Sequence, residues 1–265
     1  MVNSAGSSSA RSIPTLLQPD GRLLNTRPGC RGSGLGRRQN QLAMLARYGF
    51  ASSSRVLEIG CGVGWLAYDL ALRLSDAGAY AGLDLSEVAI SWLNDNYGAR
   101  LPNFRFDLAD VNNPTYRPRG RRKAECFVFP YPDAQFDIVC AFNVFAFMTP
   151  QSIANYLREV ARVLSSTGVA LVTVKVIGDG QLALPPNSGY IRTSEGVYAP
   201  RRGSAGAFTD ELIRDTIEDA GLDVHAFERG AWRGRSSGGP SQAPTLPRPG
   251  PDLYVLVPQR TPERT

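Results

Sequence analysis

A glycine-rich turn beside a carboxylate is the first feature of this sequence that could do chemistry. It reads Glu58-Ile59-Gly60-Cys61-Gly62-Val63-Gly64 and lies between an apolar run and a helical pattern. Glycines adopt positive φ and let a ligand lie against bare backbone. A dinucleotide loop has the spacing G-x-G-x-x-G, whereas here the third glycine comes one residue early. Because the Glu58 carboxylate would repel a pyrophosphate, the turn favours a ligand that carries an ammonium group.

Further carboxylates follow the next two apolar runs. Asp84 ends the run that starts at Tyr80, where a carboxylate could accept hydrogen bonds from both hydroxyls of a ribose. An ordinary strand-end aspartate is the alternative. Asp110 precedes Val111 and could accept a hydrogen bond from the exocyclic amine of adenine. Asp107 competes for that role, but it lies inside the predicted strand, so we favour Asp110.

The elements that must position these residues alternate between strands and helices. Such alternation predicts an α/β fold with a mostly parallel sheet and helices on both faces. The apolar patterns predict strands at 56–59, 80–84, 104–108, 136–142, 169–177, 222–227 and 253–257. They predict helices from about 37 to 48, then over 65–74, 86–96, 150–167 and 209–220.

Capping residues mark several of these helix ends. Ser86, Thr149 and Thr209 are suited to cap helix N-termini. Pro150 then occupies a first helical position, and Gly168 and Gly221 stand where helices should end.

Composition divides the chain into one folded unit with additions. Residues 1–36 are rich in Arg, Gly and Ser and predict a flexible arm. The domain is expected over 37–258, with an insertion at 112–132 and a loop at 230–251. Residues 259–265 form a tail. A further loop is expected from 178 to 207.

Charge and composition exclude several classes of protein. The net charge is +5, but the arginine excess lies in residues 1–50 and 229–265, and the segment between them is acidic. This distribution indicates solvated ends rather than a nucleic-acid groove. No apolar stretch reaches the ~18 residues of a membrane span, and the first ten residues lack the apolar core of a secretory signal. We therefore expect a cytoplasmic protein without a membrane partner.

The sequence also has too few cysteines and histidines for a metal site or a histidine-dependent hydrolase. Cys30, Cys61, Cys126 and Cys140 form no C-x-x-C pair, and His225 is the only histidine. These residues do not predict a metal site. We expect the cysteines to be reduced. A hydrolase of the Ser-His-Asp or Cys-His type would have to use His225, which we interpret as structural.

Together these motifs resemble a class I S-adenosylmethionine-dependent methyltransferase. The resemblance rests on Val56 to Gly64, Asp84, Asp110 and Phe136-Asp137-Ile138-Val139, and it spans about 37–257. Tyr156 to Leu164 resembles the family's helix before its fifth strand. Asn113-Pro114-Thr115-Tyr116-Arg117-Pro118-Arg119-Gly120 is similar to an Asn-x-x-Tyr-x-Pro-x-Gly insertion of a bacterial subgroup. That subgroup has histidine where this chain has Phe147, so no base role is carried over to this position.

The resemblance implies a Rossmann-like sheet of seven strands, S-adenosyl-L-methionine as cofactor, and methyl transfer by in-line displacement. Gly60, Cys61, Gly62 and Gly64 would line its methionine part, and Glu58 would hold its ammonium. Asp84 and Leu85 would lie at the ribose, Asp110 and Val111 at adenine, and Asn143 near the sulfonium. For the acceptor we name Tyr116, Tyr131, Phe147 and Tyr190. No catalytic base is identified.

The methyl acceptor stays open. A hydroxyl of a small molecule, such as a sugar or natural product, is the first hypothesis, and nucleic acid is the less favoured partner. The alternatives are an RNA or protein methyltransferase, a cofactor-binding protein without turnover, and a nicotinamide enzyme, which the glycine spacing disfavours. The insertion 112–132, basic and aromatic, could cover an anionic or glycosylated acceptor. It could equally be a solvated loop whose aromatic side chains face the core.

Overall fold

The computed structural model describes residues 18, 35–114, 116–177, 190–200, 206–230, 232 and 250–259, without the side chains of 35–40. Most of the predicted arm 1–36, the tail after 259 and most of the loop 230–251 lie outside the described residues. The helices are α2 (Leu35–Arg47), α3 (Trp65–Ala71), α4 (Glu87–Leu93), α5 (Pro150–Val163) and α6 (Asp210–Asp219). Short helical turns are η1 (Asn94–Gly98), η2 (Ala124–Cys126) and η3 (Phe145–Phe147).

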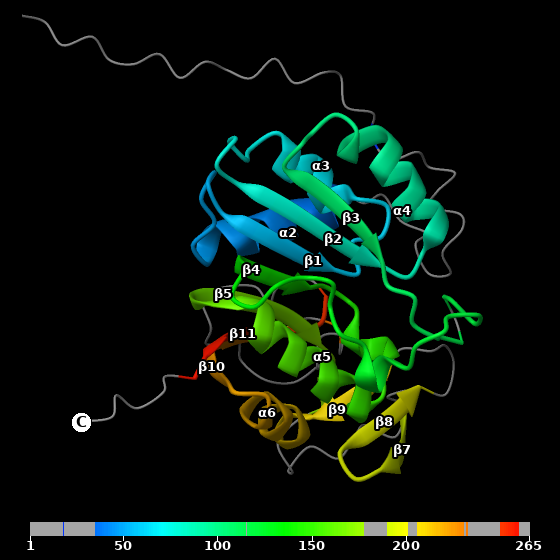
Figure 1. Ribbon diagram of the computed structural model, residues 1–265. Helices are drawn as coiled ribbons and strands as arrows, with labels where there is room; N and C mark the ends of the chain where they lie inside the picture. The colour runs from blue at the N-terminus through cyan, green and yellow to red at the C-terminus, as the bar shows by residue number, and fades with distance from the viewer. Residues whose placement is uncertain are drawn as a thin grey trace, which may run out of the picture.

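Seven strands form the central sheet, as the sequence predicts. They are β1 (Arg55–Ile59), β2 (Ala79–Asp84), β3 (Phe104–Leu108), β4 (Phe136–Ala141), β5 (Leu164–Val174), β10 (Leu222–Glu228) and β11 (Asp252–Pro258). Their order is β10-β11-β5-β4-β1-β2-β3 (Figure 1). The strands from β5 to β3 pair in parallel, while β11 pairs antiparallel with both β5 and β10. The sheet is mostly parallel, which confirms the predicted α/β class.

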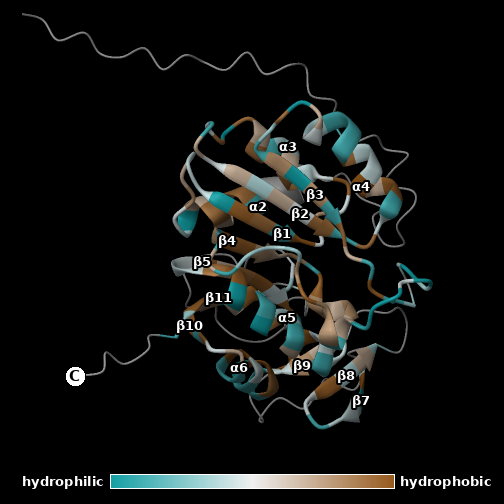
Figure 2. Cartoon of the chain, in the orientation of Figure 1, coloured by the Kyte–Doolittle hydropathy of each residue, from teal (hydrophilic) through white to brown (hydrophobic). Residues whose placement is uncertain are grey.

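Helices cover both faces of this sheet, so two apolar layers form the core. On one face α5, α6 and part of the insertion pack against strand residues such as Leu57 and Val139. On the other face α2, α3 and α4 pack against residues such as Val56 and Tyr80. Figure 2 shows apolar residues concentrated along the strands and hydrophilic residues on the outer sides of the helices. Strands buried on both faces explain the near-continuous apolar runs in the sequence.

The predicted caps hold three helices in place. The side-chain oxygens of Ser86, Thr149 and Thr209 accept backbone N–H bonds at the starts of α4, α5 and α6. These bonds satisfy donors that a helix N-terminus leaves without partners.

One predicted helix end is wrong. The sequence places the end of α5 at Gly168, but the helix stops at Val163 and β5 begins at Leu164, which pairs with Phe136. Ser165, Ser166 and Thr167 are weaker helix formers than the residues before them, so pairing with β4 wins over continued helix. Gly168 therefore lies within a strand.

A small second sheet replaces part of the loop predicted at 178–207. It has the order β6-β9-β8-β7, built from Val176–Ile177, Ala207–Thr209, Val197–Pro200 and Tyr190–Ser194. Little in the sequence predicts this sheet, since β6 and β9 are only two and three residues long. It extends from the carboxyl end of β5, at the side of the molecule where the parallel strands end (Figure 1).

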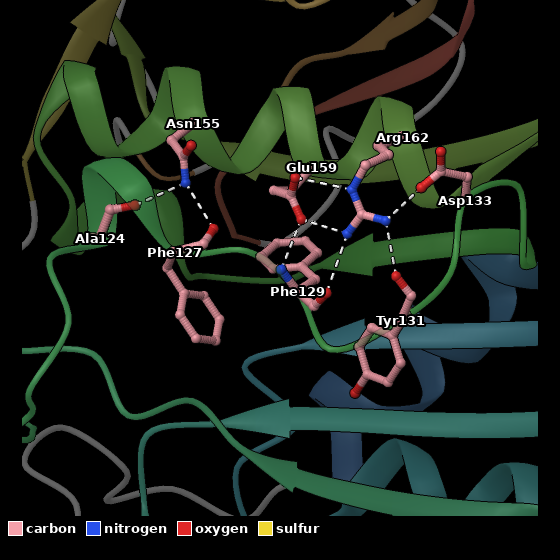
Figure 3. Close-up of polar contacts among 8 residues, drawn as sticks. All are labelled: Ala124, Phe127, Phe129, Tyr131, Asp133, Asn155, Glu159 and Arg162. Carbon is pink, nitrogen blue, oxygen red and sulfur yellow. Dashed lines mark hydrogen bonds and ion pairs between the residues drawn. The ribbon is translucent and has the colours of Figure 1, made fainter.

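The insertion at 112–132 is folded against α5. Phe127, Phe129 and Tyr131 are buried in the core. Arg162 of α5 donates hydrogen bonds to the carbonyls of Phe129 and Tyr131, and Asn155 donates to those of Ala124 and Phe127 (Figure 3). Of the two interpretations of this segment, the one with core-facing aromatic side chains is confirmed for these three residues.

Candidate functional site

The candidate site lies where β1, β2 and β4 end together. Ile59 pairs with Leu83 on one side and with Ala141 on the other, so these carboxyl ends share one edge of the sheet. In open α/β sheets this edge is where ligands bind, next to the strand at which the chain reverses its direction of winding. Here β1 is that strand, with β2 on one flank and β4 on the other. The predicted glycine turn follows β1 directly.

The turn has the backbone that only glycine adopts easily. Gly60, Gly62 and Gly64 have φ of 75°, 57° and 85°. A Cβ on Gly60 would lie 2.5 Å from Cγ2 of Val144, which follows β4. Gly60 and Cys61 both donate backbone hydrogen bonds to the carbonyl of Leu83, at 2.7 and 3.2 Å. The turn is thus fixed against both neighbouring strands.

Asp84 links the turn to the end of β2. Its carboxylate accepts hydrogen bonds from the Gly62 N–H at 2.7 Å and from the Ser86 N–H at 2.9 Å. The residue is 3% exposed. A carboxylate accepts up to about four hydrogen bonds, so one that two backbone donors orient can also accept from ligand hydroxyls. Leu85, next in the chain, packs partly buried against the core.

Glu58 is a second buried carboxylate at the turn. The Tyr80 hydroxyl donates to its Oε2 at 2.6 Å, and Glu58 is 4% exposed. Burial, reinforced by the Glu58 charge, raises the pKa of Tyr80, which therefore stays protonated and remains a donor. Two carboxylates, Glu58 and Asp84, thus flank one glycine turn.

Asp110 is part of an ionic cluster. Arg117 donates to its Oδ1 at 3.0 Å and Arg121 to its Oδ2 at 2.5 Å, and hydrogen bonding from Arg121 lowers the pKa of Asp110 to about 2. The N–H of buried Val111 donates to the Ala109 carbonyl. The competing residue, Asp107, accepts from Arg105 and Tyr131. Both aspartates therefore have partners in the chain, and the choice between them stays a prediction.

Asn143 follows β4 in a conformation that few non-glycine residues adopt. Its φ is 60°, and it is exposed. Its N–H donates to Oγ1 of Thr173 on β5 at 2.7 Å. Asparagine tolerates this left-handed region better than most residues, and such backbone outliers gather at functional sites.

Comparison with known proteins assigns this architecture. Residues 56–168 match the family described as "Methyltransferase domain". The chain is 27% identical over 189 residues to 27-O-demethylrifamycin SV methyltransferase of Amycolatopsis mediterranei. It is 25% identical over 180 residues to tRNA N(3)-cytidine methyltransferase METTL2 of Danio rerio. These alignments cover 68% and 66% of this chain, and 60% and 46% of the two relatives.

Residues 56–168 therefore match a methyltransferase domain, and solved S-adenosylmethionine-dependent methyltransferases share the fold. The fold agrees with this assignment. The structure of 1,6-didemethyltoxoflavin-N1-methyltransferase from Burkholderia thailandensis superposes with a TM-score of 0.53 at 15% identity, over 84% of this chain and 78% of that one. The chain thus has the Rossmann-like methyltransferase fold predicted from the sequence, and it spans less than two thirds of the length of the curated relatives named above.

Two of the four predicted acceptor residues lie close together. The rings of Tyr116, from the insertion, and Phe147, from η3, lie 5.5 Å apart at 87°. Tyr131 lies elsewhere, 4% exposed, with its ring against Phe136 and its hydroxyl on Asp107. This burial does not support the expectation that Tyr131 contacts an acceptor.

The fourth predicted residue, Tyr190, leads to a cluster that the sequence reasoning missed. Its hydroxyl accepts a hydrogen bond from Lys175 Nζ at 3.0 Å, and its ring lies 6.0 Å from that of Trp232. A signal for Lys175 was present, because it is the only charged residue in the apolar run 169–177. That is the same type of signal that identified Asp84, a charge at the end of a buried strand.

Other site types find no support in the part of the chain that the structure describes. No group of His, Cys, Asp and Glu could hold a metal ion there. Within the same residues, no helix has the length and apolar character to cross a membrane. His225 is exposed at a bulge of the edge strand β10.

Proposed function

We propose that this chain is an S-adenosylmethionine-dependent methyltransferase that acts on a hydroxyl of a small molecule. The observation that carries the proposal is the bond between the Asp84 carboxylate and the Gly62 N–H. It joins a buried carboxylate to a glycine turn at the edge of the sheet where ligands bind. The methyltransferase domain at 56–168 supports the same conclusion.

The charges at the turn fit this cofactor. The sulfonium and ammonium of S-adenosylmethionine outweigh its carboxylate, so a site with two buried carboxylates suits it. The Glu58 carboxylate, two residues before the first glycine of the turn, would repel the pyrophosphate of a dinucleotide. This argument also counts against a nicotinamide enzyme.

Residue roles follow from these positions. We assign the ammonium to Glu58, the ribose hydroxyls to Asp84 beside Leu85, and the methionine part to the turn from Gly60 to Gly64, Cys61 included. Adenine is assigned to Asp110 and Val111. Asn143, held by Thr173 at the end of β4, would lie beside the reacting centre.

Methyl transfer depends mainly on the alignment of the acceptor with the methyl group. S-adenosylmethionine supplies, when bound, a methyl group that its sulfonium already activates. Holding an acceptor in line with that methyl group can lower the barrier by up to ~7–11 kcal/mol. A general base would add roughly 10²–10⁴-fold for a hydroxyl acceptor. We assign no residue to that role.

A small acceptor is favoured over RNA by the way the insertion uses its arginines. Arg117 bonds Asp110 and Glu87, and Arg121 bonds Asp110. These two guanidinium groups, of the four in the insertion, are paired with carboxylates of the chain, which leaves fewer charges for contacts with phosphates. A relative that acts on a rifamycin supports a natural product as acceptor. Tyr116 and Phe147 offer an aromatic contact to such a molecule.

The second candidate is an RNA methyltransferase, which the similarity to a tRNA N(3)-cytidine methyltransferase favours. The two candidates differ in their response to salt, because each phosphate contact releases counterions. If RNA is the acceptor, its binding should weaken steeply between about 50 and 200 mM salt. Turnover of a compact acceptor should change little over that range.

The experiment is a screen for release of S-adenosylhomocysteine with a panel of hydroxylated metabolites and with total tRNA. We expect turnover with at least one small acceptor, and a loss of turnover in Asp84→Ala. Turnover with tRNA alone would favour the second candidate. Cofactor binding without turnover on any acceptor would instead support a binding protein.

A further inference from the structure

A half-buried lysine directly after β5 lies beside two aromatic rings. Lys175 Nζ lies 5.8 Å from the ring centroids of both Tyr190 and Trp232, within the range of cation–π attraction. It also donates to the Tyr190 hydroxyl at 3.0 Å. The three residues come from segments far apart in sequence: the end of β5, the start of β7 and the residues after β10.

A buried carboxylate fixes the geometry of this cluster. Asp252, 0% exposed, accepts from the Trp232 Nε1–H at 2.7 Å, the Val176 N–H at 2.9 Å and the Gly230 N–H at 2.9 Å. These bonds hold the residue after Lys175 and the ring of Trp232. Asp252 is therefore bound to N–H donors, and it does not form an ion pair with Lys175. Asp252 thus holds the backbone next to Lys175 and the indole of Trp232 in place.

Lys175 has no carboxylate within ion-pair distance among the residues that the structure describes. An ammonium has three N–H donors, and Tyr190 accepts one of them. A charge that is half-buried without a counter-charge is costly unless an anion joins it. The remaining donors suit an oxyanion, and the ring of Trp232 suits a planar group attached to it.

The cluster also lies at a suitable place for an acceptor. Thr173, which holds Asn143, is two residues before Lys175, so the two are about 7 Å apart along the chain direction. Strand β5 is two strand spacings from β1, or about 10 Å. A molecule bound by Lys175 could thus extend toward Asn143 without overlapping a nucleoside at β1 and β2.

We propose that Lys175, Tyr190 and Trp232 form a subsite for an oxyanion, carboxylate or phosphate, on a planar methyl acceptor. The subsite rests on the proposed function for its role, since the acceptor is bound there for methyl transfer. Lys175 binds the charge, Tyr190 orients the lysine, and Trp232 packs against the plane of the acceptor.

The sequence offers a sharp test, because Lys175 and Lys123 are the only lysines in the chain. Lys123 is exposed in the insertion, so Lys123→Met is a control that removes the same charge elsewhere. Calorimetry would measure binding of benzoate, phenyl phosphate and uncharged benzyl alcohol to the protein saturated with S-adenosylhomocysteine. We expect Lys175→Met to weaken binding of at least one anion by about tenfold or more, and Lys123→Met to leave it within about twofold.

The anion that binds more tightly, benzoate or phenyl phosphate, identifies the anionic group of the acceptor. Benzyl alcohol should bind the two variants equally. Tyr190→Phe keeps the ring and should lose part of the affinity. Carbon-13 methylation of the two lysines gives a second readout: the Lys175 signal should shift with the anion, while the Lys123 signal stays.

Equal anion binding by Lys175→Met and Lys123→Met, or no anion binding by the wild-type chain, would overturn the subsite. S-adenosylhomocysteine affinity is measured in the same samples, and unchanged affinity shows that Lys175→Met is folded. A chain that binds no S-adenosylhomocysteine contradicts the proposed function instead, and the anion titration without cofactor still tests the subsite.

Discussion

At the scale of single residues, the carboxylate of Asp84 is the most informative group. It joins the glycine turn to β2, and its hydrogen bonds to Gly62 and Ser86 orient it. Asp84→Ala should weaken binding of S-adenosylhomocysteine by ~1–3 kcal/mol, because ligand hydroxyls would lose their partner in a buried site. Calorimetry on the folded variant measures this loss. Asp95→Ala, an exposed aspartate after α4, is the matched control and should bind normally.

Asp110 gives a prediction about acid. Arg121 and Arg117 lower its pKa from an unfolded value near 3.9 to about 2. A depressed folded pKa means that the ionic cluster stabilises the fold above the unfolded pKa and loses that effect as the pH falls toward the folded pKa. The stability difference between wild type and Asp110→Asn should therefore shrink from about pH 5 to about pH 2. Urea unfolding at several pH values measures it, and a difference constant over this range would contradict the assignment.

The sequence could identify those site residues whose chemistry depends on position along one strand or turn. Gly60, Gly62, Gly64 and Asp84 are of this kind, and the structure brings them together. The role of Tyr131 could not be predicted from the sequence, since an aromatic side chain in an insertion faces either the core or a ligand. Trp232 gave no distinguishing signal, because its partner Lys175 is 57 residues away and only the fold joins them.

At the scale of elements, α5 and the insertion form one unit. Arg162 pairs with Glu159 and Asp133 and donates to the carbonyls of Phe129 and Tyr131 (Figure 3). Arg162→Ala would remove one donor from each of these carbonyls and the ion pairs to Glu159 and Asp133, at a cost of about 1–3 kcal/mol. Chemical denaturation should show this loss, with faster hydrogen exchange in 124–131. The control is Arg158→Ala, on the exposed side of the same helix, which should change stability by less than about 0.5 kcal/mol.

Elements with a strong local signal were predictable, and those fixed by pairing were not. The period of α6 and its cap Thr209 lie within the element itself, and its predicted start is confirmed. The end of α5 depends on Leu164 pairing with Phe136, a contact between distant segments. The strands β6 and β9 are stabilised by each other and by β8, so no local pattern marks them.

At the scale of the whole molecule, cofactor binding should be visible as thermal stabilisation. A ligand that binds only the folded state stabilises it by RT ln(1 + [L]/Kd), about 2.7 kcal/mol at one hundred times Kd. For a domain of roughly this size each kcal/mol raises Tm by ~2–4 °C, so S-adenosylhomocysteine should raise it by about 5–10 °C. The buried Glu58 carboxylate beside the turn predicts that NAD, which carries a pyrophosphate, should not raise Tm in this way.

The comparison of ligands separates a specific site from general binding to a basic chain. The net charge of +5 would attract the NAD anion more than S-adenosylhomocysteine, so charge alone predicts the opposite order of thermal shifts. Net charge therefore cannot explain a larger rise in Tm with S-adenosylhomocysteine than with NAD. If Asp84→Ala also reduces that rise, the arrangement of Glu58, Asp84 and the glycine turn explains it. An equal or larger rise in Tm with NAD would contradict the proposed cofactor and would indicate that the glycine turn binds a dinucleotide.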